Sequence, residues 1–254
     1  MAESLSHKFG QIIGDLLESA LLPHFEKFAR ENRLYLDKKG IRQARKGKKV
    51  TWTDEKGNSH DLDFVLENGG TENKIGVPVA FIESAWRRGT RHSKNKVQEI
   101  QAAINPIVLK HKTTVCFKGA ILGGDFTHPS LKQLESDNFS VLYFPTEIFE
   151  KAFKKFHLNI ISDDATTEEE FRKRIEIWEK FGQKNQLLDE LLELKTLAVN
   201  EFFGALRLAV SRHIEQILIL PLYGKPSTVN NATEAISRQL RIPGDPTIFT
   251  IKGI

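Results

Sequence analysis

Acidic and basic side chains alternate with apolar runs in two neighbouring stretches, "SHDLDFVLE" (59–67) and "VPVAFIESAWRRGTRHSKNK" (77–96). In the first stretch Asp61 and Asp63 alternate with apolar residues as in a β-strand, so both aspartates are expected on one face. Glu83 ends the next apolar run, and pairing of the two strands would bring it beside Asp63. Converging carboxylates are the hard oxygen ligands that Mg²⁺ binds, and Mg²⁺ polarises phosphodiesters. These residues therefore predict a metal-dependent phosphodiester cleavage site.

Two basic segments accompany the acids. Seven of the twelve residues from Lys38 to Lys49 are Lys or Arg and none is acidic, and a second basic run extends from Trp86 to Lys96. Such clusters attract a polyanion. The candidate DNA contacts are Lys39, Arg42, Gln43, Arg45, Lys46 and Lys48 in the first segment and Arg87, Arg88, Arg91, His92 and Lys94 in the second. The alternative interpretation is that both runs are solvated faces and that Glu83 pairs with a nearby arginine.

Composition narrows the class of protein. The 254 residues carry a net charge of +4, with 40% hydrophobic and 28% charged residues, which is typical of a soluble globular protein. No apolar run is as long as a membrane span, so no membrane association is expected. The single cysteine, Cys116, excludes an internal disulfide framework and a cysteine-rich zinc site, and it favours a reducing cytoplasm. The nucleotide-binding patterns GxxxxGK[ST] and GxGxxG are both missing from the sequence.

The pattern of apolar residues predicts an α/β core around a mixed sheet, followed by a largely helical region. The expected elements are a helix over 5–32, a β-hairpin over 48–67, a strand over 77–84, a helix over 93–109, a strand over 113–124, a helix over 128–136 and a strand over 139–145. Residues 186–214 have a long helical pattern. We expect a core domain over 1–158 and a helical accessory or dimerisation region over 159–254. That region ends in a strand-helix-strand segment packed on the core.

These features resemble the PD-(D/E)xK nuclease superfamily. An aspartate in a hairpin, Asp63, precedes by about twenty residues an acid that ends the following strand, Glu83, and a helix follows. The resemblance covers about the first half of the chain and implies a restriction-endonuclease-like αβββαβ core. It implies that Asp63 and Glu83 bind Mg²⁺, with Asp61 and the helix-borne Glu18 as further candidates.

The sequence departs from this superfamily at one important position. Ala85 stands two residues after Glu83, where the superfamily has a catalytic lysine. Arg87, Lys94 and Lys96 lie close enough along the chain to replace it. Lys96 is our preferred replacement because Lys96 and Glu99, three residues apart, share one face of the expected helix.

The leading hypothesis is a Mg²⁺-dependent endodeoxyribonuclease that cuts double-stranded DNA, resembling a type II restriction enzyme. Cutting at palindromic sites would require a homodimer, and the helical region over 160–215 could supply its interface. One alternative is a DNA-binding module that has lost catalysis, which Ala85 favours. A repair or structure-specific nuclease is another alternative, and an α/β enzyme acting on small phosphorylated substrates is a third.

Overall fold

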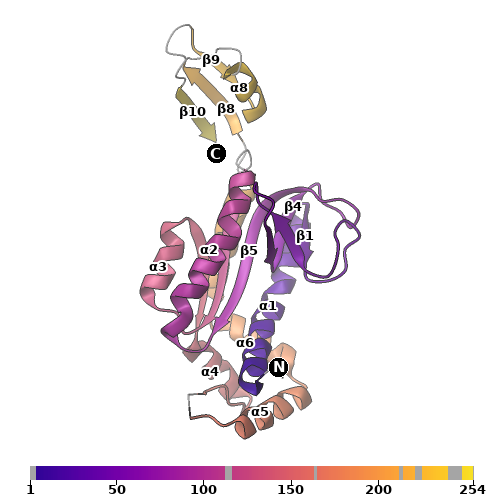
Figure 1. The fold of residues 1–254 in the computed structure, drawn as a ribbon, viewed down its shortest axis with the longest axis vertical. Helices are drawn as coiled ribbons and strands as arrows, with labels where there is room; N and C mark the ends of the chain where they lie inside the picture. The colour runs from indigo at the N-terminus through magenta and orange to yellow at the C-terminus, as the bar shows by residue number, and fades with distance from the viewer. Residues whose placement is uncertain are drawn as a thin grey trace. The chain divides into compact units, whose positions relative to one another are not determined.

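A five-stranded sheet organises the first part of the chain (Figure 1). The computed structural model describes residues 4–111, 116–162, 165–211, 214–220, 225–239 and 248–253. Across the sheet the strands are β1 (Leu34–Lys38), β4 (Phe64–Asn68), β5 (Val77–Arg87), β6 (Phe117–Gly124) and β7 (Phe139–Pro145). The first three strands pair antiparallel, whereas β5, β6 and β7 run parallel. The prediction of an α/β protein with a mixed sheet is therefore confirmed.

Helices cover both faces of this sheet. One face carries α2 (Ser93–Lys110) and α3 (His128–Ser136), and α1 (Leu5–Glu31) contacts β1 and β5. The apolar residues of α2 recur every three or four positions, so they form one stripe. Three of them, Val97, Ile100 and Ile104, are fully buried in a cluster with residues of β5 and β6. On α1, Phe25 stacks on Phe64 of β4 at 4.9 Å between ring centroids.

The strand pattern near the acids differs from the expected hairpin. Strands β2 (Val50–Thr53) and β3 (Ser59–Leu62) do form a hairpin, but the chain then continues into β4 of the main sheet. All of Phe64 to Glu67 is buried, which is typical of a strand covered on both faces. The expected single strand over 59–67 is therefore two strands that belong to different sheets. Strand β1 was not predicted at all.

Four helices follow the sheet: α4 (Thr146–Lys155), α5 (Glu168–Lys180), α6 (Lys184–Glu193) and α7 (Thr196–Ser211). The single long pattern over 186–214 is thus broken into α6 and α7. The break lies where the Oγ1 of Thr196 donates to the carbonyl of Glu193. Both α5 and α6 contact α1.

The chain divides into two compact units, Met1–Leu206 and Arg207–Ile254. This division differs from the expected boundary after residue 158, because the helices beyond that residue pack on α1 and α4.

The second unit contains β8 (Ile214–Leu220), β9 (Ser227–Val229), α8 (Ala232–Gln239) and β10 (Ile248–Gly253). Its strands form an antiparallel sheet in the order β10-β8-β9. The prediction that this segment packs on the core stays a prediction. Among the described helices, none combines the length and the apolar character that crossing a membrane requires.

Candidate active site

The pairing of β4 with β5 brings two of the predicted acids together. Phe64 pairs with Ile82, so the next residues, Asp63 and Glu83, lie near each other where the two strands meet, and the charge of Asp63 raises the pKa of Glu83. The Oδ2 of Asp63 accepts a hydrogen bond of 2.6 Å from the backbone N–H of Ser84. Asp63 lies at the bend between β3 and β4, and this bond fixes its carboxylate against β5.

A third carboxylate reaches the same place from α1. Burial, together with the charges of Asp63 and Asp15, raises the pKa of Glu18 to about 7. Asp15 lies one turn before Glu18 on the helix, so the two side chains are on the same face. Asp15 was not predicted as a site residue, although its spacing from Glu18 was the signal that could have identified it.

Lys96 of α2 supplies positive charge to this site. Its Nζ lies 3.7 Å from Oε1 of Glu83 and 3.4 Å from Oε2 of Glu99. Glu83 and Ala85, two apart on β5, point toward α2. Ala85 packs in the same apolar cluster as Val97, the neighbour of Lys96. The helix-borne Lys96 therefore lies beside Glu83, close to the strand position that Ala85 occupies.

The site holds more negative than positive charge. The pKa of Glu83 is raised to about 8, first by burial and then by repulsion from Asp63, and the charge of Lys96 opposes this rise. Burial likewise raises the pKa of Asp63, against the hydrogen bond from Ser84 and the charges of Lys96 and Lys39. The Oε2 of Glu83 is buried and has no hydrogen-bond partner. We refer to Asp15, Glu18, Asp63, Glu83 and Lys96 as the acidic cluster.

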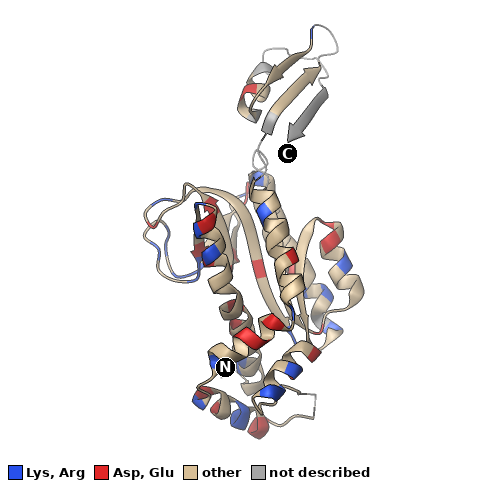
Figure 2. Ribbon diagram, turned by 180° about the vertical axis from the view of Figure 1, so that it is seen from behind, with Lys and Arg blue, Asp and Glu red and all other residues tan. Residues whose placement is uncertain are grey.

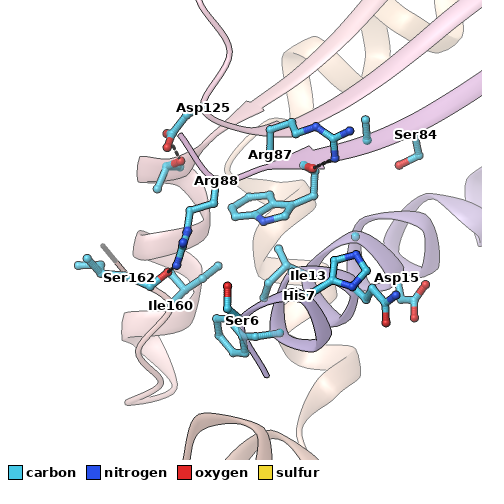
Figure 3. A pocket seen from close by; sticks show the side chains of 18 of the residues that line it. Ser6, His7, Ile13, Asp15, Ser84, Arg87, Arg88, Asp125, Ile160 and Ser162 are labelled. Carbon is cyan, nitrogen blue, oxygen red and sulfur yellow. Dashed lines mark hydrogen bonds between the residues drawn. The ribbon is translucent and has the colours of Figure 1, made fainter. Parts of the chain in front are cut away.

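Two hollows give access to the acidic cluster. A cavity of about 620 Å³ is lined by Glu18 and Lys96 together with the end of β5 (Figure 3). A second hollow of about 320 Å³ is lined by Asp63, Glu18 and Lys39. Asp15 and Glu18 line both. Asp15, Glu18 and Asp63 thus line hollows that open to the outside, whereas Glu83 lines neither hollow.

A divalent cation fits these residues in chemical terms. Within the described part of the chain, no three His, Cys, Asp or Glu side chains already surround one metal position. Mg²⁺ does not need such a cage, because it commonly binds one or two carboxylates and completes its shell with water and phosphate oxygens. Asp63 and Glu83 provide two carboxylates. The Oε2 of Glu83 has no partner, and burial followed by repulsion from Asp63 raises the pKa of this residue, so a cation there would stabilise its ionised form.

Asp61 does not belong to the acidic cluster, contrary to expectation. Its Oδ2 lies 2.7 Å from Nζ of Lys49, and its Oδ1 accepts from Thr51 at 2.7 Å. These interactions lower its pKa. The expectation assumed one continuous strand through 59–67, but the bend at Asp63 interrupts the alternation of faces. Asp61 is a surface residue of the β2–β3 hairpin.

Arg42 is also placed differently from expectation. Its side chain is only 2% exposed, and Nη1 lies 2.6 Å from Oε1 of Glu67 and 2.9 Å from Oδ2 of Asp37. Its other nitrogens donate to Oε2 of Glu67 and to the carbonyls of Thr71 and Lys74. The expected DNA contact of Arg42 does not fit this burial.

Arg45 joins Arg42 in the same set of buried ion pairs. Its Nε lies 3.2 Å from Oδ2 of Asp37, and its other nitrogens donate to the carbonyls of Gly47 and Lys38. Arg45 is therefore an anchor of the loop and not a free contact. We refer to Asp37, Arg42, Arg45 and Glu67 as the anchoring cluster.

The remaining basic candidates are distributed over the surface. Lys39, Gln43, Lys46 and Lys48 are exposed on the loop that the anchoring cluster holds, and Figure 2 shows basic residues following one another along this projecting loop. In the second segment Arg88, Arg91 and Lys94 are exposed, and Arg87 lies 3.6 Å from Glu99. The side chain of His92 lies outside the described residues.

Comparisons with known proteins give little further information. No family model matches this sequence, and no curated protein matches it. One similar solved structure is named "Crystal Structure of Protein of Unknown Function AF1548". The similarity covers 74% of this chain and 99% of that chain, with 10% sequence identity and a TM-score of 0.32. A similarity at this level carries no argument about fold or function.

Proposed function

We propose that this protein is a Mg²⁺-dependent endodeoxyribonuclease that hydrolyses phosphodiester bonds of double-stranded DNA. The observation that carries the proposal is the acidic cluster: Asp63 and Glu83 lie near each other where β4 and β5 meet, with Lys96 beside Glu83 and too little positive charge to balance them. Setting the β2–β3 hairpin aside, the order α1-β1-β4-β5-α2-β6 is the αβββαβ order of the PD-(D/E)xK superfamily, which the sequence resembles.

Each residue has a role in this proposal. Asp63 and Glu83 would hold Mg²⁺, with Glu18 as a further ligand or as a base. Bound there, Mg²⁺ supplies Lewis-acid polarisation of a phosphoryl oxygen. Lys96, half-buried beside Glu83, would orient the attacking water and stabilise the negative charge that develops on the phosphoryl group. Hydrolysis adds this water across one P–O bond and leaves a phosphate monoester and a hydroxyl group.

Basic residues around the cluster would bind the DNA backbone. Lys39 lines the hollow beside Asp63, and Lys46 and Lys48 extend from the same anchored loop. Lysines held on a rigid loop contact phosphates at a smaller cost in conformational entropy than lysines on a mobile one. Sequence-specific cutting of the type II restriction class is the form of the activity that we favour.

A homodimer in the cytoplasm belongs to this proposal. Leu197 of α7 is 73% exposed and Ile177 of α5 is 54% exposed, so the region over 160–215 offers apolar surface to a second copy. Two active sites related by a two-fold axis would cut both strands of a palindrome. Sedimentation equilibrium with and without DNA would measure the stoichiometry.

The experiment that tests the activity compares supercoiled and linear double-stranded DNA with Mg²⁺ and with EDTA. The wild type should nick or cut only with Mg²⁺, and discrete fragments would indicate site-specific cutting. Asp63→Asn should abolish cutting, whereas Asp61→Asn, two residues away and outside the acidic cluster, should retain it. DNA binding without cutting under any metal condition would instead support the alternative of a binding module on this scaffold.

A further inference from the structure

The 620 Å³ cavity beside the acidic cluster has the dimensions of a small-ligand site. Its lining includes Glu18 and Lys96, and Arg88 lies beside Ser162 in its wall (Figure 3). Pockets of about 300–1,000 Å³ bind single small molecules. A double helix, whose major groove alone is about 12 Å wide, cannot enter such a space. A single nucleotide can.

Trp86 gives this cavity a fixed aromatic surface. Its indole packs edge-on against Phe149, with 4.8 Å between ring centroids, yet the residue remains partly exposed and lines the cavity. Gly123 and Gly124 of β6 lie close to the same ring. An aromatic ring that is immobilised on one side and open on the other is the surface on which bases stack in single-strand-binding proteins.

Two glycines of α1 face the indole although packing does not demand them. A Cβ added at Gly10 would lie 3.8 Å from Cδ1 of Trp86, and one added at Gly14 would lie 3.9 Å from its Cβ. Both are ordinary van der Waals distances, and neither glycine has a positive φ. Glycine destabilises a helix interior relative to alanine. The feature that glycine preserves here, and alanine would reduce, is free space beside the indole.

Two polar groups of the cavity wall are available to a ligand, one buried without a partner and one exposed to solvent. The Oγ of Ser84, which lines the cavity, is buried and has no hydrogen-bond partner. Nη1 of Arg88 donates to Oγ of Ser162 at 3.4 Å and the guanidinium lies 5.6 Å from the ring centroid of Phe171, while no carboxylate of the described residues lies within ion-pair distance of it. The adjacent Gly89 N–H donates to Asp125 at 2.8 Å, which holds the loop in place. A hydroxyl and a guanidinium are suited to a base edge and a phosphate respectively.

We infer that this cavity binds one nucleotide of the DNA, with its base extruded from the double helix against Trp86 and its phosphate toward Arg88. The inference rests on the proposed function, since it assigns the nucleotide beside the bond to be cut. Extruding a base costs unstacking and unpairing energy, and this cost is smallest for a nucleotide that is already unpaired. The protein should therefore prefer DNA that carries an unpaired nucleotide.

The test measures binding in EDTA, so that it does not depend on cleavage. Fluorescence anisotropy would compare a short labelled duplex with the same duplex containing one extrahelical nucleotide. The wild type should bind the second duplex about tenfold more tightly, because stacking of one base contributes an effect of this order. The double variant Gly10→Ala/Gly14→Ala should lose this preference and melt at the same or a higher temperature.

A matched control distinguishes the effect of filling the cavity from the effect of stabilising a helix. Gly204 of α7 has open space where a Cβ would be, so Gly204→Ala should raise the melting temperature and keep the preference. Equal affinity of the wild type for both duplexes, or a preference that survives in the double variant, would overturn the inference. Mg²⁺-dependent cutting by a protein without this preference would leave the proposed function standing, whereas preference without cutting would contradict only the proposed function.

Discussion

Two clusters of buried charge lie on neighbouring strands of the same sheet and are built in opposite ways. In the anchoring cluster, the arginines Arg42 and Arg45 meet the acids Asp37 and Glu67, and Glu67 also accepts from the N–H of Gly76. In the acidic cluster, by contrast, Lys96 is the cation within ion-pair distance of Glu83, and the carboxylate keeps an unpartnered oxygen. The first cluster is electrically balanced, and the second is not.

This difference suits the anchoring cluster to a role in stability and the acidic cluster to a role in the proposed function. A buried charge without a partner is costly, so a fold retains one only where something else compensates. The anchoring cluster needs nothing further, since its partners are protein groups. In the acidic cluster one carboxylate oxygen has no partner, two hollows lie beside the cluster, and in the proposed function a bound Mg²⁺ would supply the missing positive charge. Substitutions in the two clusters test this contrast.

Neutralising the acidic cluster should remove activity without loss of stability. Glu83→Gln keeps the size of the side chain and removes its charge, so we expect Mg²⁺-dependent cutting to fall by about 10³-fold or more. Stability at pH 8 should remain the same or rise, because the burial and the repulsion that raise the pKa of Glu83 no longer oppose folding. Plasmid nicking and thermal melting on the same preparation measure both effects. A variant that cuts normally would remove Glu83 from the site.

Breaking the anchoring cluster should have the opposite effect. Arg42→Met leaves Glu67 and Asp37 buried with one partner fewer, and loss of one partner from a buried ion pair costs about 3–5 kcal/mol. Urea denaturation measures this change in the free energy of unfolding. Gln43→Ala, at an exposed side chain in the next position, should change it by less than about 0.5 kcal/mol. Equal effects of the two substitutions would contradict the structural role of Arg42.

The contrast also explains which parts of the site could be predicted from sequence. Helix α1, strand β5 and helix α2 were predictable because their apolar residues recur with a clear period, and this period placed Glu83 and Lys96. The burial of Arg42 was not predictable, because its partners Glu67 and Thr71 lie on another strand and another loop. Asp61 was misassigned because alternation of faces holds only within one strand, and Asp63 lies at a bend between two.

The pH dependence of stability should reveal the raised pKa of Glu83. The folded protein raises the pKa of Glu83 from 4.5 to about 8, so the folded state binds more protons than the unfolded state between these values. The contribution of Glu83 to the free energy of unfolding is fully present below pH 4.5 and is lost as the pH rises toward 8. The loss is on the order of a few kcal/mol. Thermal melting of wild type against Glu83→Gln isolates this contribution from that of other acids.

Mg²⁺ should reverse that loss. Because a bound cation favours the ionised carboxylates, binding should release protons and raise the melting temperature more at pH 8 than at pH 5. The wild type should show this difference, and Glu83→Gln should show little of it. A Mg²⁺ effect that is independent of pH, or equal in both proteins, would argue against metal binding at Glu83.

Lys96 and Lys94 offer a matched pair for testing the lysine that the helix supplies. Both lie in the first turn of α2, but Lys96 approaches Glu83 whereas Lys94 is exposed. Lys96→Met should lower the rate of cutting about 100-fold, in the range for one transition-state-stabilising group, and DNA affinity should change little. Lys94→Met should keep the rate within a few-fold. Equal effects in the two variants would assign both lysines to DNA binding alone.

The smallest effects are expected on the anchored loop, where each lysine would contribute one phosphate contact under the proposed function. Lys46→Ala or Lys48→Ala should weaken DNA binding similarly for all sequences and reduce the slope of log K against log salt by about 0.9 per contact. Lys132→Ala, which removes a surface lysine of α3 paired with Glu135, is the control and should leave the slope unchanged. An unchanged slope in Lys46→Ala and Lys48→Ala would mean that the anchoring cluster stabilises the loop for a purpose other than binding the DNA backbone.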